Sequence, residues 1–226
     1  MKSLICLQEK FMYKKVNIKP NQKIVFIGDS ITDAGRTEPA YKPLGNGYVH
    51  FAANTLLAKY PNYRLNIINT GINGDTIRLL AKRWDEDCIQ HKPDLVSVMI
   101  GINDLWRQHV EPDRLHEAVF PKEYEITYKL LLSKLKQHCN CDIVLMEPFM
   151  FCNDPENKMY KALQTYLDIV HKLSEEFNTT LVTLMHDIEK ALNEVPSKLW
   201  SDDMVHPFVW AHCWIAQRWL DGVDNR

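Results

Sequence analysis

The sequence has little of what marks a membrane protein or a nucleic-acid-binding protein. We find no apolar segment that approaches the length of a transmembrane helix. Its 27 lysines and arginines nearly balance its 29 aspartates and glutamates, which gives a net charge of -2, and neither sign forms a long block. We therefore expect that neither nucleic acid nor a membrane is a partner of this protein.

The first residues also lack the features of a secretion signal. Residues 1–20 mix lysines with short apolar clusters and contain neither a continuous apolar stretch nor a small-residue cleavage site. The 6 cysteines are scattered, and Cys139 and Cys141 have neither the usual redox spacing nor the usual zinc spacing. We expect reduced thiols in a cytoplasmic protein, and neither a metal ion nor an organic cofactor.

What the sequence does contain is an alternation of short apolar runs and amphipathic segments. The length of 226 residues and the apolar content of 46% predict a single domain over residues 1–226. Its core is expected over about residues 23–220, after an N-terminal extension over residues 1–22. The predicted strands are residues 24–27, 65–68, 95–100, 143–146 and 181–184.

Helical periodicity separates these strands. The predicted helices cover residues 49–60, 77–84, 124–138 and 159–177, and a last one runs from Pro207 to about residue 220. Strands that alternate with helices predict βαβ units and a parallel sheet. Residues 33–47 and 104–121 are predicted to be long irregular insertions after strand ends, where the rim of a pocket would lie.

Polar motifs follow the first three strands, and a fourth lies near the C-terminus. They are Gly28-Asp29-Ser30, Asn69-Thr70-Gly71-Ile72-Asn73-Gly74, Gly101-Ile102-Asn103-Asp104, and Asp202-Asp203-Met204-Val205-His206-Pro207. Each alone is also explained as a turn or a helix cap. Ligands of open α/β sheets collect at the carboxyl ends of the strands, however, so four such motifs predict one common site.

Together these motifs contain the groups that acyl transfer needs. The Ser30 hydroxyl is a poor nucleophile until a base removes its proton, and a histidine, with an ordinary pKa of roughly 6.5, suits that task. Asp203, three residues before His206, can orient the imidazole, and the spacing favours it over Asp202. The other eight histidines have no comparable partner nearby in the sequence.

The negative charge that develops in such a reaction needs preorganised donors. The backbone N–H groups of Ser30 and Gly74 and the side chain of Asn103 can supply three, so these residues form the predicted oxyanion hole.

The four motifs, in this order and over roughly residues 23–220, resemble the blocks of the SGNH (GDSL-type) hydrolase family. The resemblance implies an α/β fold, a flavodoxin-like three-layer α/β/α sandwich with a five-stranded parallel sheet. It also implies Ser30 as nucleophile, His206 as base and Asp203 as its orienting acid, with Ser30, Gly74 and Asn103 as the oxyanion hole. The G-x-S-x-G elbow of α/β-hydrolases is absent, which argues against that fold.

Three stretches of the sequence resemble those of acetyl-xylan and xylo-oligosaccharide esterases in particular. They are GDSITDAGR at residues 28–36, LGNGYV at 44–49 and MIGINDLWRQ at 99–108. This resemblance implies a carbohydrate acetylesterase with a small acetylated saccharide as substrate. Asp29, Trp106 and Arg107 are the candidate substrate-binding residues, although packing beneath the insertion explains Trp106 equally well. Trp200 and Trp210 are expected to pack.

Two other functions fit parts of the pattern. A lysophospholipase or a thioesterase could use the same scaffold, because acyl specificity depends on the shape of the pocket. A non-catalytic carbohydrate-binding protein could keep the fold, but the intact Ser30, Asp203 and His206 count against it. Helix faces in such a sandwich can support a homo-oligomer, for which the sequence locates no interface.

Overall fold

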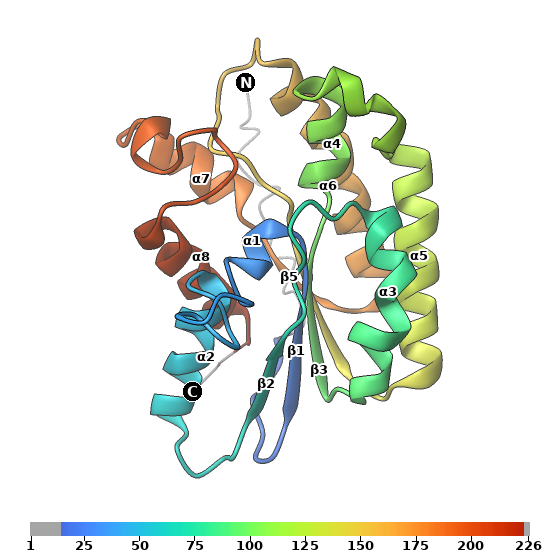
Figure 1. The fold of residues 1–226 in the computed structure, drawn as a ribbon, viewed down its shortest axis with the longest axis vertical. Helices are drawn as coiled ribbons and strands as arrows, with labels where there is room; N and C mark the ends of the chain where they lie inside the picture. Colours follow the sequence, from blue (N-terminus) through green and yellow to red (C-terminus); the bar gives the residue numbers. More distant parts are fainter. Residues whose placement is uncertain (1–14, 224–226) are drawn as a thin grey trace, which may run out of the picture.

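The computed structural model describes residues 15–223, in which five parallel strands lie between two layers of helices (Figure 1). The strands are β1 (Lys23–Gly28), β2 (Asn66–Asn69), β3 (Leu95–Met99), β4 (Asp142–Met146) and β5 (Thr180–Val182). Their order across the sheet is β2-β1-β3-β4-β5, and every neighbouring pair is parallel. The predicted fold class is confirmed, because each apolar run forms a strand of this flavodoxin-like sheet.

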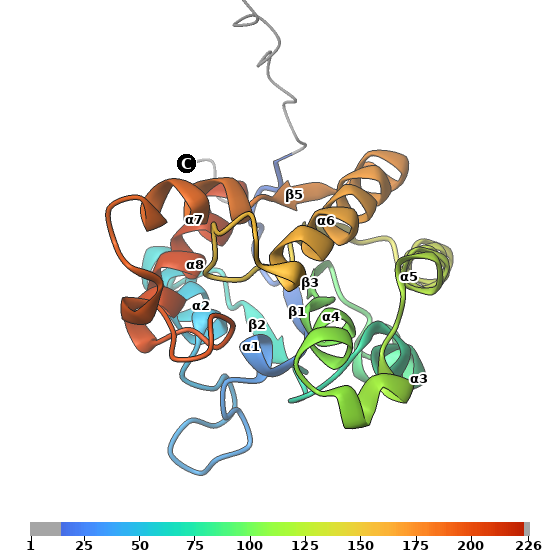
Figure 2. The ribbon, with the colours of Figure 1, turned by 90° about the horizontal axis from the view of Figure 1, so that it is seen from above.

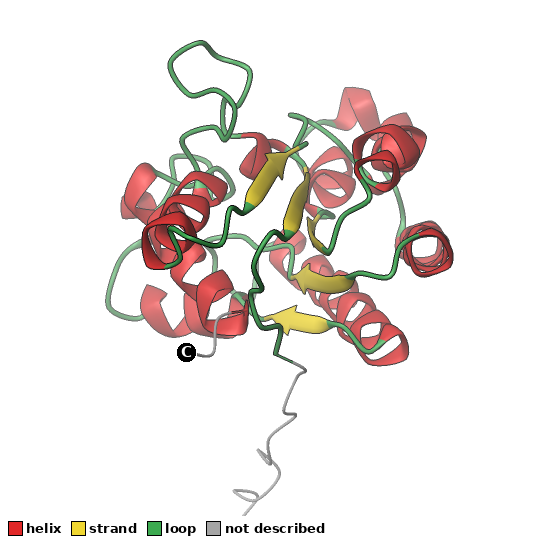
Figure 3. Ribbon diagram, turned by 90° about the horizontal axis from the view of Figure 1, so that it is seen from below, coloured by secondary structure: helices red, strands yellow, loops and turns green. Residues whose placement is uncertain are grey.

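Helices cover both faces of the sheet, as Figures 1 and 2 show from two directions. One layer contains α2 (Tyr48–Lys59), α7 (Met185–Leu192) and α8 (Val209–Val223), and the other contains α3 (Ile77–Asp87), α5 (Pro121–His138) and α6 (Lys158–Phe177). The short helices α1 (Ser30–Asp33) and α4 (Ile102–His109) directly follow β1 and β3. Figure 3 shows the molecule from below, opposite to the view of Figure 2, with helices on either side of the sheet.

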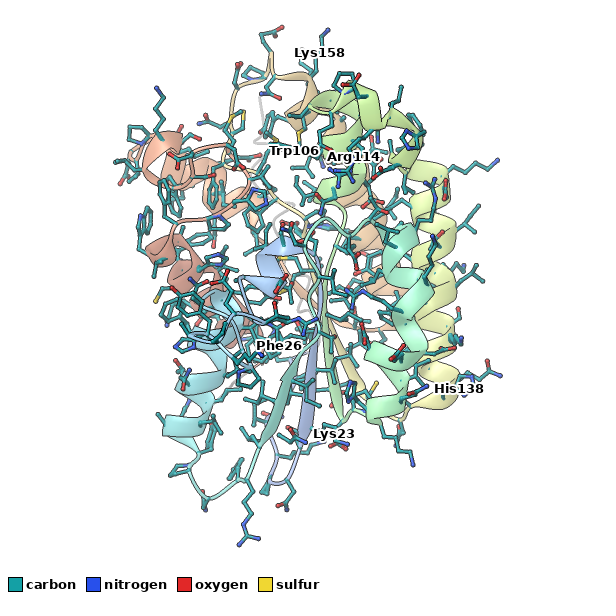
Figure 4. All side chains as sticks on the ribbon, viewed as in Figure 1. Lys23, Phe26, Trp106, Arg114, His138 and Lys158 are labelled. Atoms are coloured by element: carbon teal, nitrogen blue, oxygen red, sulfur yellow. The ribbon has the colours of Figure 1, made fainter. Side chains whose placement is uncertain are left out.

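The central strands are apolar on both faces because both faces are covered. All five residues of β3 are buried, as are five of the six in β1, whereas β2 at the edge is only partly buried. Phe26 of β1 (labelled in Figure 4) packs between Tyr48 of α2 and Trp219 of α8, with its ring centre 4.8 Å from that of Trp219. Aromatic burial of this kind fixes the helix layer on the sheet and so fixes the strand ends that carry the site.

Three details differ from the sequence-based expectation. The last helix begins at Val209 rather than at Pro207. Residues 104–121 are not irregular, because α4 and the 3₁₀ segment η2 (Pro112–Glu117) occupy most of them. Part of the predicted N-terminal extension, residues 1–14, lies outside the described residues, but Val16 and Ile18 are buried in the core. The packed part of the chain therefore begins before residue 23.

The segment between α1 and α2 agrees with the prediction. Residues 34–46 form a series of turns without a regular element, and in Figure 2 they project from the body of the molecule.

Among the described residues, no helix combines the length and the apolar character needed to cross a membrane.

Candidate active site

The register of the sheet brings the first three motifs to one edge. Gly28 pairs with Met99 across β1 and β3, and Phe26 pairs with Asn69 across β1 and β2. Ser30, two residues beyond Gly28, is therefore close to the residues that follow β2 and β3. A parallel sheet places all of its carboxyl ends on this one side.

Ser30 is the first residue of α1, and Asp29 caps this helix. The Asp29 carboxylate accepts a hydrogen bond from the Ile31 N–H at 3.0 Å. Asp29 is only 1% exposed, and its burial raises its pKa to about 7. It holds the turn that presents the serine hydroxyl, and it has almost no surface with which to contact a substrate.

The predicted base and its acid lie on an irregular loop before α8. One oxygen of Asp203 accepts hydrogen bonds from the N–H groups of Val205 (2.9 Å) and His206 (2.8 Å) and from the Ser201 hydroxyl (2.9 Å). The other accepts from His206 Nδ1 at 2.6 Å. Partial burial acts to raise the pKa of Asp203, but these hydrogen bonds, above all that of the imidazole, lower it to about 2.

The imidazole connects this loop to the serine across 176 residues of sequence. His206 Nε2 lies 3.0 Å from Ser30 Oγ. With Nδ1 donating to the charged Asp203, Nε2 is left to accept the serine proton. Asp202 is exposed and makes none of these contacts, so Asp203 is the acid that orients the ring.

The loop after β2 lies directly against α1. Ile72 N–H donates to the Gly28 carbonyl at 3.0 Å, and a Cβ on Gly71 would come within 2.3 Å of the Asp33 nitrogen. Only glycine permits this approach of two backbones. Gly74 has φ +82°, a conformation that residues with a side chain rarely adopt.

Asn103 lies in the first turn of α4, and its side chain is directed to the same loop. Its Nδ2 donates to the Asp75 carbonyl at 2.9 Å, and the amide keeps a second hydrogen for another acceptor. The next residue, Asp104, is buried and accepts from the Ile77 N–H at the start of α3. Burial raises the pKa of Asp104 to about 8.

Two arginines that support the site differ from what sequence reasoning assigned. Arg83 of α3, not identified from the sequence, donates to the Gly28 carbonyl (2.9 Å), the Thr70 carbonyl (2.5 Å) and the Asp75 carboxylate (2.6 Å). Arg107, a candidate for substrate binding, has a side chain only 5% exposed. It forms an ion pair with Glu111 and donates to the Gly74 carbonyl at 3.3 Å. Both arginines therefore hold loops of the site.

Trp106, the third candidate substrate-binding residue, lies at a cavity. Its ring centre is 6.4 Å from that of His206, and it lines a cavity of about 410 Å³. Trp200, by contrast, is buried and packs against Phe151 and Trp210, as expected. Within residues 15–223 no group of three or more histidine, cysteine, aspartate or glutamate side chains could hold a metal ion.

The sequence analysis did not identify a second histidine that is paired with an acid. His171 Nε2 lies 2.5 Å from the buried carboxylate of Glu147, which also accepts from the N–H groups of Leu184 (2.7 Å) and Met185 (2.8 Å). Glu147 and His171 are 24 residues apart, so a comparison of each histidine with its neighbours in the sequence does not find this pair. Glu147 follows β4 directly and ties α6 to the start of α7.

Comparison with known proteins agrees with this architecture. Residues 26–209 match the model of the GDSL-like lipase/acylhydrolase family. An acetylxylan esterase of Geobacillus stearothermophilus is 38% identical over 213 residues, which cover 91% of this chain and 95% of that protein.

Solved structures give the same result. The crystal structure of Axe2, an acetylxylan esterase from Geobacillus stearothermophilus, matches with a TM-score of 0.86 at 36% identity, over 92% of this chain and 99% of that one. LAE5, described as an alpha/beta hydrolase enzyme from the metagenome of Lake Arreo, matches with a TM-score of 0.85 at 33% identity, over 91% and 96%. Catalytic mutants of Axe2 in which a serine, an aspartate or a histidine is replaced by alanine also match.

Proposed function

We propose, from the premise that this chain belongs to the GDSL-like lipase/acylhydrolase family, that it is a serine esterase acting on O-acetyl groups of sugars or xylo-oligosaccharides. The observation that carries the proposal is the continuous contact from Ser30 Oγ through His206 to Asp203. The similarity to an acetylxylan esterase supports the substrate class. The catalytic mutants of Axe2 affect the same three residue types.

In the first half of the reaction, His206 Nε2 removes the proton of Ser30 as Oγ attacks the acetyl carbonyl carbon. The negative charge that develops on the carbonyl oxygen is stabilised by the N–H groups of Ser30 and Gly74 and by the Asn103 amide. Each such donor contributes about 2.7–4 kcal/mol to transition-state stabilisation. Asp203, charged because of its low pKa, stabilises the imidazolium that forms.

The tetrahedral intermediate then breaks the bond between the acyl carbon and the sugar oxygen. His206 gives its proton to that oxygen, so the sugar leaves as an alcohol and Ser30 keeps the acetyl group. In the second half, His206 deprotonates a water molecule, which attacks the acyl-enzyme. Acetate leaves, and the proton returns to Ser30.

The replacement Ser30→Ala tests the mechanism directly. We expect it to lower kcat for p-nitrophenyl acetate by at least about 10⁴-fold, because the nucleophile is lost. Ser133→Ala, which removes an exposed hydroxyl of α5, is the matched control and should keep full activity. Retained turnover in Ser30→Ala would eliminate the mechanism. A fluorophosphonate probe should label the wild type at Ser30, and a purely carbohydrate-binding protein would remain unlabelled.

The length of the acyl chain separates the acetylesterase from a lysophospholipase or thioesterase. Rates that fall steadily from acetyl to octanoyl p-nitrophenyl esters would support a small acyl pocket. Rates that rise with chain length would instead favour the lipid-directed alternatives.

We also propose that the enzyme works in the cytoplasm. In the described part of the chain the cysteines are free, and Cys88, Cys139, Cys141 and Cys152 are buried as thiols. Unpaired thiols in such numbers are typical of reducing compartments.

A further inference from the structure

A groove beside the triad has no role in the mechanism above. We call it the Trp106 groove; it is the cavity of about 410 Å³ between the end of α4 and the start of α6. Its lining residues are Trp106, His109, Val110, Met150, Asn157, Lys158, Met159, Asp203 and Met204. Its size lies within the range of about 300–1,000 Å³ that is usual for small-molecule sites. In Figure 4, Trp106 and Lys158 lie at the same end of the molecule.

The position of this groove matches where the leaving group must be. The sugar oxygen receives its proton from His206 Nε2, so the saccharide attached to that oxygen begins beside the imidazole. The Trp106 groove contains Asp203, and the Trp106 ring lies against the His206 ring. The larger cavity of about 520 Å³, around residues 40–54 and Val209, contains no residue of the triad.

The residues that line the groove include one lysine and no arginine. Lys158 is exposed, and within residues 15–223 its ammonium group forms no ion pair or hydrogen bond. His109, which also lines the groove, has its pKa lowered by partial burial and by the charge of Lys158. The Asp203 carboxylate is already occupied by its own hydrogen bonds. Asp203 is paired with His206, so Lys158 is the charged side chain of the groove that is left for a bound anion.

We infer that the Trp106 groove binds the sugar next to the acetylated one, and that Lys158 makes the enzyme prefer saccharides that carry a carboxylate there, such as a uronic acid. This inference rests on the proposed acetylesterase function. Trp106 supplies an apolar wall for the sugar ring, and Lys158 supplies the counter-charge for its acid group.

The experiment compares two acetylated xylo-oligosaccharides of equal length, one neutral and one with a uronic acid substituent. The readout is the ratio of kcat/KM for the acidic substrate to kcat/KM for the neutral one. Any change in the chemistry at Ser30 cancels in this ratio. We expect Lys158→Gln to lower the ratio about three- to fivefold, the upper part of the range for an exposed ion pair. Lys158→Glu should lower it further, because a like charge repels the acid group.

Lys82→Gln is the matched control, since it removes the same charge from an exposed position of α3 outside the groove. It should leave the ratio unchanged. The difference between wild type and Lys158→Gln should also shrink as salt is raised from 50 to 500 mM, because exposed charges are screened. Val110→Trp, which fills the groove, should raise KM for both saccharides more than for p-nitrophenyl acetate.

The outcomes separate the inference from the function on which it rests. If the wild type hydrolyses acetyl esters but the ratio is the same in Lys158→Gln as in wild type, the preference for acids is refuted. If Val110→Trp raises KM for all three substrates equally, the groove is not the sugar site. If the wild type hydrolyses no acetyl ester at all, the proposed function itself has failed.

Discussion

Asp203→Asn tests the orientation of the base with the least disturbance of the fold. One carboxylate oxygen of Asp203 accepts two backbone N–H groups and the Ser201 hydroxyl, so the asparagine must place its amide oxygen there. Its NH₂ group then faces His206 Nδ1, which can satisfy it only as an acceptor. The imidazole proton moves to Nε2, and that nitrogen can no longer take the proton of Ser30.

The expected loss follows from this wrong tautomer. In a serine–histidine–aspartate triad the same exchange lowers kcat by about 10⁴-fold, which corresponds to about 5.4 kcal/mol of transition-state stabilisation. The hydrogen bonds that fix the loop remain, so we expect the free energy of unfolding to fall by only about 1 kcal/mol. Asp203→Ala should lose the activity and also about 2 kcal/mol or more of stability, because three donors lose their acceptor.

The assay is kcat/KM on p-nitrophenyl acetate, with urea unfolding on the same preparations. Asp202→Asn is the matched control, because it removes the same charge one residue away and should change activity less than about twofold. An Asp203→Asn enzyme within tenfold of wild type would refute the argument that Asp203 orients the base. Equal unfolding free energies for the Asn and Ala variants would refute the assignment of a separate loop-fixing role to its other oxygen.

Two further predictions concern packing and pH. The hydrogen bond to Glu147 raises the pKa of His171, so its stabilisation is complete below about pH 6.5 and is lost as pH rises through the folded-state pKa. His171→Gln should therefore lower the free energy of unfolding, measured in urea, by about 1 kcal/mol at pH 6 and by little at pH 9. The expected loss is small because the imidazole is partly exposed. An equal loss at both pH values would contradict the ion pair. Gly71→Ala should cost about 2–3 kcal/mol and most of the activity, since its Cβ would meet the Asp33 backbone at 2.3 Å. Gly74→Ala should lower the free energy of unfolding only by its conformational strain, about 1–2 kcal/mol. Thermal unfolding of the two variants tests whether Gly71→Ala is the less stable one.

Much of the fold could be predicted because its cause is local. Each strand is a short apolar run buried on both faces, and alternation with helices leaves a parallel sheet as the arrangement that covers those faces. Parallel connectivity then places the carboxyl ends of all strands on one side of the sheet. The sequence alone therefore predicted that Ser30, Gly74 and Asn103 lie close together. The pairing of Asp203 with His206 followed from a separation of only three residues.

What could not be predicted depends on contacts between distant segments. Helix α4 covers only eight residues, and the Asn103-Asp104 pair at its start also fits a turn, so its periodicity was too short to recognise. Arg83 is one of several arginines in an amphipathic helix. Nothing in its neighbourhood in the sequence indicates that it joins the ends of β1 and β2. The carboxylate of Glu147 and the imidazole of His171 are 24 residues apart on different elements.

The segment between β4 and α6, residues 147–157, connects the chemistry to the groove. The loop that carries His206 has no regular structure, but Phe151 N–H donates to the Met204 carbonyl at 2.7 Å, and the Phe151 ring stacks on Trp200. Ser197 Oγ donates to the Phe151 carbonyl at 2.5 Å. The base is therefore positioned by this segment as well as by Asp203.

The same segment reaches the Trp106 groove through Met150 and Asn157. A saccharide bound in the groove would therefore contact the same segment that holds the His206 loop. A small ester such as p-nitrophenyl acetate has no saccharide to place in the groove. Binding energy distant from the ester raises kcat where it is realised in the transition state, and a segment that contacts both the groove and the His206 loop is where such an effect would arise.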